Sequence, residues 1–93
     1  MSIWYKQGVY GDLLPEAAEG LRRLERAYDK RHKDVYVTSI RDGSHMAGSY
    51  HPWGKAFDVR KNGMTKAFVK RAVVRGFDVV EHSTHFHIEW DPK

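Results

Sequence analysis

The chain has 93 residues, of which 41% are hydrophobic and 30% are charged, and it contains no cysteine. These values predict one globular domain over residues 1–93, and the lack of cysteine excludes disulfides, cysteine-ligated zinc fingers and thiol nucleophiles. Any metal ion must therefore be held by histidine and carboxylate side chains. Sixteen Lys and Arg against 12 Asp and Glu give a formal net charge of +4, which favours an anionic partner but is more typical of simple solubility.

Targeting signals are not apparent in the sequence. The apolar runs are only a few residues long, and the N-terminus has neither a basic region followed by an apolar stretch nor a small-residue cleavage site. We therefore expect no signal peptide, synthesis in the cytoplasm and no membrane insertion.

The N-terminal part of the chain predicts an arm followed by a helix. Residues 1–11 carry several aromatic side chains and predict an ordered arm that packs on the core. A helix is expected over about residues 15–31, because Pro15 suits a first helical turn and apolar residues recur every three to four positions up to Tyr28. The other face of this helix is basic and consists of Arg22, Arg23, Arg26, Lys30 and Arg31. Glutamates interleave with these cations, so a solvated face is a better interpretation than a nucleic-acid surface.

The rest of the chain alternates strands, loops and one more helix. β-Branched and aromatic residues predict a strand over 34–40, and Gly, Ser and Pro residues predict a long loop over 41–54. The elements expected after this loop are a strand over 55–60, a turn at Asn62-Gly63, a helix from Met64 that ends at Gly76, and strands at 79–80 and 84–90. This order predicts an α+β fold, in which two helices pack on a small antiparallel sheet.

A first candidate site surrounds Asp58. Alternation along its strand directs the apolar neighbours to the core and Asp58 to the other face, so we expect this carboxylate at the edge of an apolar sheet. Burying an ionised carboxylate without a cation costs about several kcal/mol, so an Arg, a helix N-terminus or a metal ion must lie nearby. His51 is a candidate partner, because Pro52 and Gly54 prevent a helix and let the loop fold back over the strand. A direct hydrogen bond between His51 and Asp58 is the alternative to a shared metal.

A second candidate site lies in the C-terminal strand. His85, His87 and Glu89 share one face there, and the apolar residues between them share the other, which must be the buried one. Metal sites use two imidazoles spaced in this way, because both rings project into the same space.

The first of these segments resembles a known motif. Ser49-x-His51-x-x-Gly54-x-Ala56-x-Asp58 is similar to the SxHxxGxAxD motif of the LAS-type, M15-like zinc peptidases. This superfamily includes D-Ala-D-Ala carboxypeptidases, phage L-alanyl-D-glutamate endopeptidases and MepA-like murein endopeptidases. Val37-Thr-Ser39-Ile-Arg41 is similar to the strand and Arg that precede the loop in this family. His82-x-x-His85-Phe86-His87 is similar to the HxxHxH ending of the MepA branch. The resemblance covers about residues 35–90 and implies a hedgehog/DD-peptidase-like zinc peptidase core.

The resemblance also implies roles for individual residues. His51, Asp58 and His87 would bind Zn²⁺ and leave a fourth position for water, as catalytic zinc sites do. Arg41 would bind a carboxylate or carbonyl of the substrate. Ser49 is interpreted as a hydrogen-bond donor to the substrate or the loop, because no base at triad spacing supports it as a nucleophile.

The proton-transfer group is the point at which this sequence departs from part of the family. Many members have Asp or Glu three residues before the third ligand, whereas Thr84 stands there in this chain. The MepA-like interpretation assigns the catalytic role to His85 or His82, with Glu81 as a reserve candidate. The alternative for His85 is that it only orients the substrate or donates a hydrogen bond to a carboxylate.

Together these features predict a zinc-dependent peptidase that hydrolyses peptide bonds in bacterial peptidoglycan, of the phage endolysin type. It would act as a monomer on the cell wall after release from the cytoplasm, with peptidoglycan peptides as substrate and no specific nucleic-acid partner. The alternative hypothesis is a catalytically inactive, zinc-stabilised binding module for the cell wall or another acidic polymer.

Overall fold

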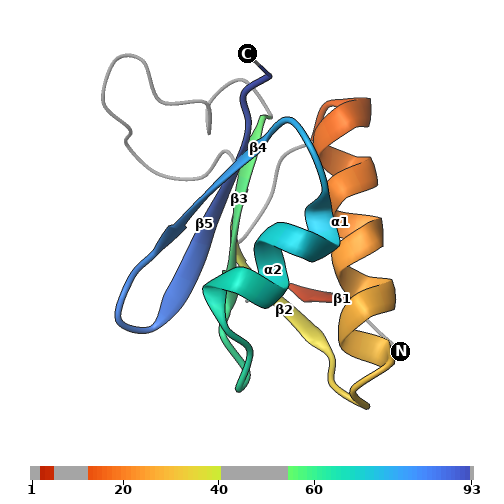
Figure 1. The fold of residues 1–93 in the computed structure, drawn as a ribbon, viewed down its shortest axis with the longest axis vertical. Helices are drawn as coiled ribbons and strands as arrows, with labels where there is room; N and C mark the ends of the chain where they lie inside the picture. The colour runs from red at the N-terminus through yellow and green to blue at the C-terminus, as the bar shows by residue number, and fades with distance from the viewer. Residues whose placement is uncertain (1–2, 6–12, 41–54, 93) are drawn as a thin grey trace.

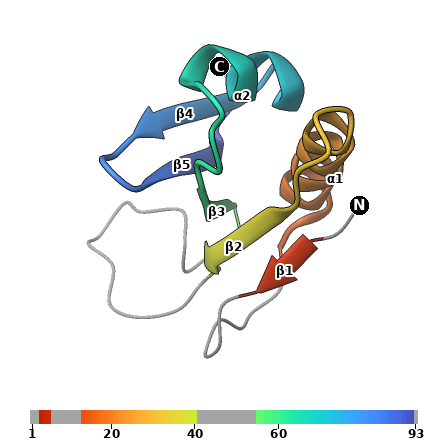
Figure 2. The same cartoon turned by 90° about the horizontal axis from the view of Figure 1, so that it is seen from below.

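The computed structural model describes residues 3–5, 13–40 and 55–92 and folds them into a five-stranded sheet with two helices on one face (Figures 1 and 2). In chain order the elements are β1 (Ile3–Tyr5), α1 (Pro15–Asp29), β2 (Val35–Ser39), β3 (Ala56–Arg60), α2 (Lys66–Val73), β4 (Phe77–Glu81) and β5 (His85–Trp90). Within these residues neither helix is long and apolar enough to cross a membrane.

The strands lie in the order β1-β2-β3-β5-β4. All neighbouring pairs are antiparallel except β1 and β2, which are parallel. The α+β class is therefore confirmed, but the prediction of a purely antiparallel sheet is wrong, because the sheet is mixed. The difference comes from the N-terminal arm, where Ile3–Tyr5 forms an edge strand that is too short to show a two-residue period. Helix α1 supplies the crossover that a parallel connection requires.

The two helices begin and end close to the predicted positions. Helix α1 has Pro15 in its first turn and ends at Asp29, two residues before the predicted end at 31. Helix α2 begins after Thr65, whose hydroxyl accepts a hydrogen bond from the Phe68 amide at 3.1 Å. This N-cap places the start of the helix two residues after Met64, which still packs in the core.

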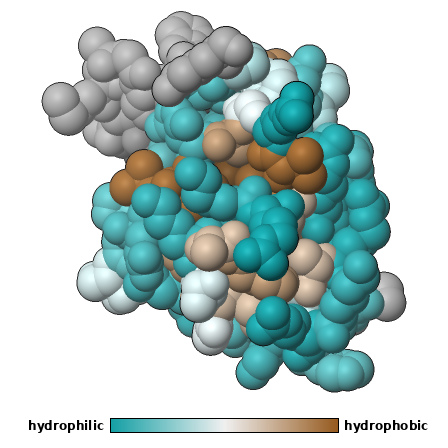
Figure 3. Space-filling view, in the orientation of Figure 1, coloured by the Kyte–Doolittle hydropathy of each residue, from teal (hydrophilic) through white to brown (hydrophobic). Residues whose placement is uncertain are grey.

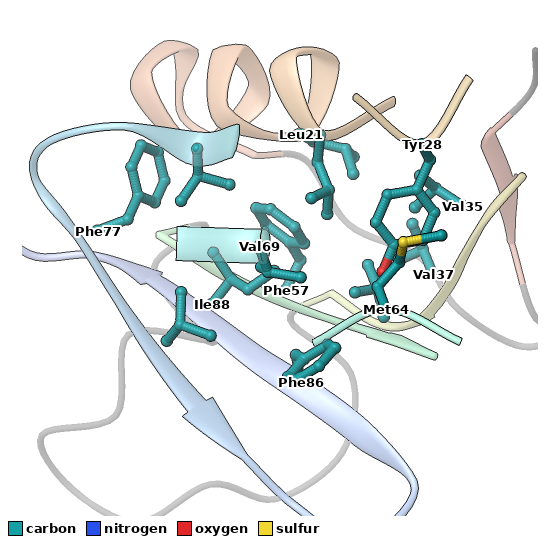
Figure 4. Close-up of a cluster of buried hydrophobic side chains, with 14 of the residues drawn as sticks. Leu21, Tyr28, Val35, Val37, Phe57, Met64, Val69, Phe77, Phe86 and Ile88 are labelled. Carbon is teal, nitrogen blue, oxygen red and sulfur yellow. The ribbon is translucent and has the colours of Figure 1, made fainter. Parts of the chain in front are cut away.

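The hydrophobic core lies between the helices and one face of the sheet (Figure 4). Phe57, Phe86 and Ile88 point from the strands into this layer and are fully buried. Helix α1 packs closely on the sheet at Gly20, where a Cβ atom would lie 2.4 Å from Cζ of Phe77. Leu21, Leu24 and Tyr28 complete the buried side of this helix. Burial of this apolar face fixes which residues of β3 and β5 point the other way.

Strand β3 is the middle strand of the sheet and has neighbours on both sides. Asp58 therefore lies at the centre of the sheet. The prediction that it lies at an edge is wrong, because β3 pairs with β5 on one side and with β2 on the other. On its other side, the pairing with β2 contains a bulge: Val37 pairs with Val59, but Ser39 pairs with Asp58. Thr38 is the extra residue of this bulge. After it, the alternation of side chains between the two faces of β2 is shifted by one residue, next to Asp58.

Candidate metal centre

Asp58 and His87 are directly opposite each other on β3 and β5. The Nδ1 atom of His87 lies 2.8 Å from Oδ1 of Asp58, and both side chains are largely buried, with 16% of His87 and 18% of Asp58 exposed. Their neighbours in sequence, Phe57, Phe86 and Ile88, occupy the core on the opposite face. Core packing on one face of the sheet therefore holds the imidazole and the carboxylate together on the other.

The second ring nitrogen of His87 contacts another carboxylate. Its Nε2 atom lies 2.5 Å from Oε1 of Glu89, two residues further along the same strand face. Burial alone would lower the pKa of the His87 imidazole, but the hydrogen bonds to Asp58 and Glu89 outweigh burial and raise its pKa above the ordinary value. In the absence of metal, His87 can donate from both nitrogens to the two carboxylates as an imidazolium.

His85 lies beside this pair on the same face of β5. Its Nε2 atom is 3.8 Å from Oδ2 of Asp58, the carboxylate oxygen that does not contact His87. Its Nδ1 atom is 3.1 Å from the hydroxyl of Thr84. The ring of His82 stacks on the ring of His85, with centroids 4.6 Å apart and planes inclined by 20°. Asp58 therefore has one imidazole near each of its oxygens.

Glu81 lies apart from these groups. It pairs with Phe86 at the end of β4, whereas the neighbouring residue Val80 pairs with His87. Paired residues share a face, so Glu81 belongs to the face opposite His87. Its carboxylate accepts a 2.8 Å hydrogen bond from the Lys61 ammonium. The structure therefore does not bring Glu81 together with Asp58 and His87.

A pocket of about 530 Å³ opens next to Asp58 and His85. The described residues that line it are Thr38, Ser39, Asp58, Arg60, Thr84 and His85. Thr38 and Ser39 are consecutive, and the bulge in β2 accounts for both reaching one pocket. The pocket therefore combines a carboxylate, an imidazole, three hydroxyls and one guanidinium, groups that suit a polar substrate such as a peptide.

Three residues of the predicted site, Arg41, Ser49 and His51, lie outside the described residues. Among the described residues no group of three or more His, Asp and Glu side chains is arranged to hold a metal ion. Asp58 and His87 supply two of the three predicted ligands, and these donors suit zinc. Two ligand atoms of tetrahedral zinc lie about 3.3 Å apart, given metal–ligand distances of about 2.0–2.1 Å. The 2.8 Å separation of the two side chains is that of a direct hydrogen bond, and they would have to move apart by about 0.5 Å to share a zinc ion.

Glu89 and Arg60 were given no role by the sequence patterns. Strand alternation already placed Glu89 on the face of His85 and His87, and that shared face is the signal that could have found it. Arg60 could have been found in the same way, because it stands two residues after Asp58 and therefore shares its strand face. It pairs with His85 across β3 and β5. Its guanidinium also lies 6.0 Å from the centroid of the Tyr36 ring.

Comparisons with protein-family models, curated proteins and solved structures give no match for this chain. The proposed function therefore rests on the residues of the site and their geometry.

Proposed function

We propose that this protein is a zinc-dependent peptidase that hydrolyses peptide bonds in bacterial peptidoglycan, in the manner of a phage endolysin. The observation that carries the proposal is the pairing of Asp58 with His87 beside a polar pocket. These residues stand at the positions where the resemblance to M15-like peptidases requires two zinc ligands. His51 is the third ligand in this proposal.

In this proposal His87 binds the metal through Nδ1, while its Nε2 atom contacts Glu89. A neutral imidazole carries one proton, and the contact of Nε2 with the Glu89 carboxylate favours the tautomer that is protonated there. Nδ1 then has a lone pair directed toward Asp58 and available to a cation. Metal-bound histidines commonly donate their other N–H to a carboxylate in this way, which fixes the ring and raises its basicity. Glu89 is thus the positioning residue of the proposed site.

His85 is the proposed proton-transfer residue. Its Nε2 atom lies 3.8 Å from Oδ2 of Asp58, both residues line the pocket, and Thr84 Oγ1 contacts the other ring nitrogen. In this position the imidazole can take a proton from a water molecule held between Asp58 and the substrate, and later return it to the leaving amine. When bound, zinc lowers the pKa of such a water molecule to about 7 and polarises the scissile carbonyl.

The substrate is proposed to enter through the pocket along β2 and β3. Among the described residues that line this pocket, Arg60 supplies the cationic side chain. The hydroxyls of Thr38 and Ser39 can form hydrogen bonds with a peptide backbone. Arg41, which the resemblance assigns to substrate binding, would add a second guanidinium. The proposed substrate is therefore a peptide that carries a carboxylate near the bond to be cleaved, as peptidoglycan stem peptides do.

The experiment that tests this proposal is release of amino groups from purified peptidoglycan. Protein stripped with a chelator and reloaded with zinc should release new amino groups, and Asp58→Asn prepared in the same way should not. Mass spectrometry of the released peptides identifies the bond. Zinc bound at one per chain without any release of amino groups would overturn the enzymatic proposal.

That result would favour the second candidate function, a zinc-stabilised module that binds the cell wall or another acidic polymer without cleaving it. The observation in its favour is Thr84, which lines the pocket where many M15-like members carry an acid. A module of this kind would sediment with peptidoglycan in a zinc-dependent way and leave its peptides intact.

A further inference from the structure

A groove of about 440 Å³ runs between α1 and α2. Five cationic side chains line it: Arg23, Arg26, Lys30 and Arg31 from α1 and the turn after it, and Arg71 from α2. None of the described residues that line the groove is acidic. The helices cover the sheet face opposite Asp58 and His87 (Figure 2), so the groove is separate from the candidate metal centre.

The Glu19 carboxylate does not neutralise this charge. Glu19 is shared among three guanidiniums, Arg22 at 2.8 Å, Arg26 at 3.6 Å and Arg23 at 3.8 Å. No carboxylate of the described residues forms an ion pair with Lys30 or Arg71. Hydrophilic side chains cover the surface over α1, on the right of the space-filling view (Figure 3). The groove therefore keeps an excess of positive charge that is open to solvent.

The spacing of the cations suits a ligand with several charges. Arg23 and Lys30, the C-cap residue of α1, are seven residues apart, which corresponds to about 10 Å along a helix. This distance exceeds the Debye length of about 8 Å at physiological salt, so only a ligand that extends along the groove engages cations at both ends. A single small anion would contact only part of the array. Four of the five side chains are Arg, whose planar fork binds phosphate groups bidentately.

The groove offers little to a nucleic-acid base. Phe68 is the aromatic residue among its described lining, and the Arg31 guanidinium lies 4.6 Å from the centroid of that ring. Tyr28 packs against the same ring in a tilted arrangement, with centroids 6.0 Å apart. Proteins that bind single-stranded nucleic acid stack bases on accessible aromatic faces. The groove instead presents cationic side chains along its length, where they can contact the charged backbone of a polymer.

We propose that the groove between α1 and α2 binds a phosphodiester polymer that lacks aromatic bases, namely a polyol phosphate of the kind attached to bacterial cell walls. The site would hold the protein on its polymer while leaving the pocket at Asp58 open. Binding here needs neither zinc nor catalysis, so the proposal can fail or succeed independently of the peptidase function.

The test measures binding of fluorescently labelled poly(glycerol phosphate) to the full chain by anisotropy. The variant Lys30→Gln/Arg71→Gln removes two groove cations and leaves the Glu19 pairs and the Arg31–Phe68 contact in place. Lys33→Gln/Lys66→Gln is the matched control, because it removes the same charge from exposed positions that do not line the groove. Thermal melts of both variants establish that they fold.

We expect the groove variant to bind at least about tenfold more weakly and the control to stay within about twofold of the parent. The slope of log K against log salt should become shallower by about 0.7 for each phosphate group that the variant no longer binds, as for single-stranded polyanions. Equal weakening in the two variants would show diffuse charge attraction and overturn the proposal. Tighter binding of a single-stranded oligonucleotide of equal charge would also overturn it, in favour of a nucleic-acid site.

Discussion

His87 on β5 faces Asp58 on β3, and the two side chains contact each other at 2.8 Å across the middle of the sheet. Both strands have hydrogen-bonded neighbours on each side, so this pair is held by the most constrained part of the fold. The sheet therefore fixes the backbone positions of two of the three proposed zinc ligands, Asp58 and His87.

The first prediction concerns zinc binding. Protein purified without chelator should contain one zinc ion per chain, and Asp58→Asn, His87→Ala and His51→Ala should each lose it. Elemental analysis and competition with a chromophoric chelator measure the ratio and the affinity. Glu81→Gln should keep its zinc, because Glu81 lies on the opposite sheet face and contacts Lys61. A ratio near zero in the parent protein after zinc supplementation would contradict the assignment.

The second prediction concerns Glu89. Glu89→Gln keeps the size of the side chain and removes the carboxylate that contacts His87 Nε2. Zinc affinity should fall about 10- to 100-fold, which is the usual effect of removing a carboxylate that supports a metal-bound histidine. Glu81→Gln is the matched control and should bind zinc like the parent. Unchanged affinity in Glu89→Gln would show that the contact with His87 does not support a metal ligand.

The third prediction concerns proton transfer. His85→Ala should retain zinc and lose about 10²- to 10⁴-fold in turnover, because a general base contributes about that factor. His82→Ala removes the ring that stacks on His85 and should have a smaller effect. Loss of zinc in His85→Ala, with zinc retained in His87→Ala, would mean that His85 is the ligand and that the assignment is displaced by two residues.

The fourth prediction follows from the raised pKa of His87 in the metal-free protein. The folded chain binds this proton more tightly than the unfolded chain, whose histidines have a pKa of about 6.5. The resulting stabilisation is complete below that value and is lost as the pH rises through the folded-state pKa. The urea midpoint of metal-free protein should therefore decrease as the pH rises above about 6.5. The decrease should be smaller in Asp58→Asn, and an identical pH profile in that variant would exclude the Asp58 contact as its cause.

The fifth prediction concerns packing of α1 on the sheet. Alanine has a better helix propensity than glycine, yet Gly20→Ala should destabilise the protein, because the new methyl group would lie 2.4 Å from Cζ of Phe77. Overpacking of this kind costs about 1–3 kcal/mol, which denaturant titration resolves. Phe77→Leu in the same chain should recover part of the loss. A stabilised Gly20→Ala variant would show that the ring of Phe77 moves aside without cost.

The local elements could be predicted from the sequence because their patterns are strong. Helix α1 carries Pro15 at its start and a regular apolar stripe, and β5 alternates histidines with core residues. The partners of β3 could not be predicted, because a strand with one apolar face has the same pattern at an edge or at the centre of a sheet. The parallel pairing of Ile3–Tyr5 escaped prediction because three residues hold too little pattern.

The candidate site was predictable to a similar extent. Asp58, His85 and His87 follow from strand alternation together with the motif that they resemble. The same alternation places Glu89 on the same face, but its contact with His87 Nε2 could not be predicted, because a carboxylate on a polar face is usually solvated. The pocket lined by Thr38 and Ser39 depends on the bulge in β2, which leaves no mark in the composition of that strand.

The bulge also makes one wall of the pocket depend on the number of residues in β2. Before Thr38 the strand keeps Val35 and Val37 in the core, and after it Ser39 lies against Asp58. Deleting Thr38 would restore a regular ladder in which Val37 still pairs with Val59 and Ser39 still pairs with Asp58, so the core packing would be kept. The chain would lose the bulge and the Thr38 hydroxyl, and with them one wall of the pocket. The shape of the pocket thus depends on the number of residues in β2, as it depends on residue identity elsewhere.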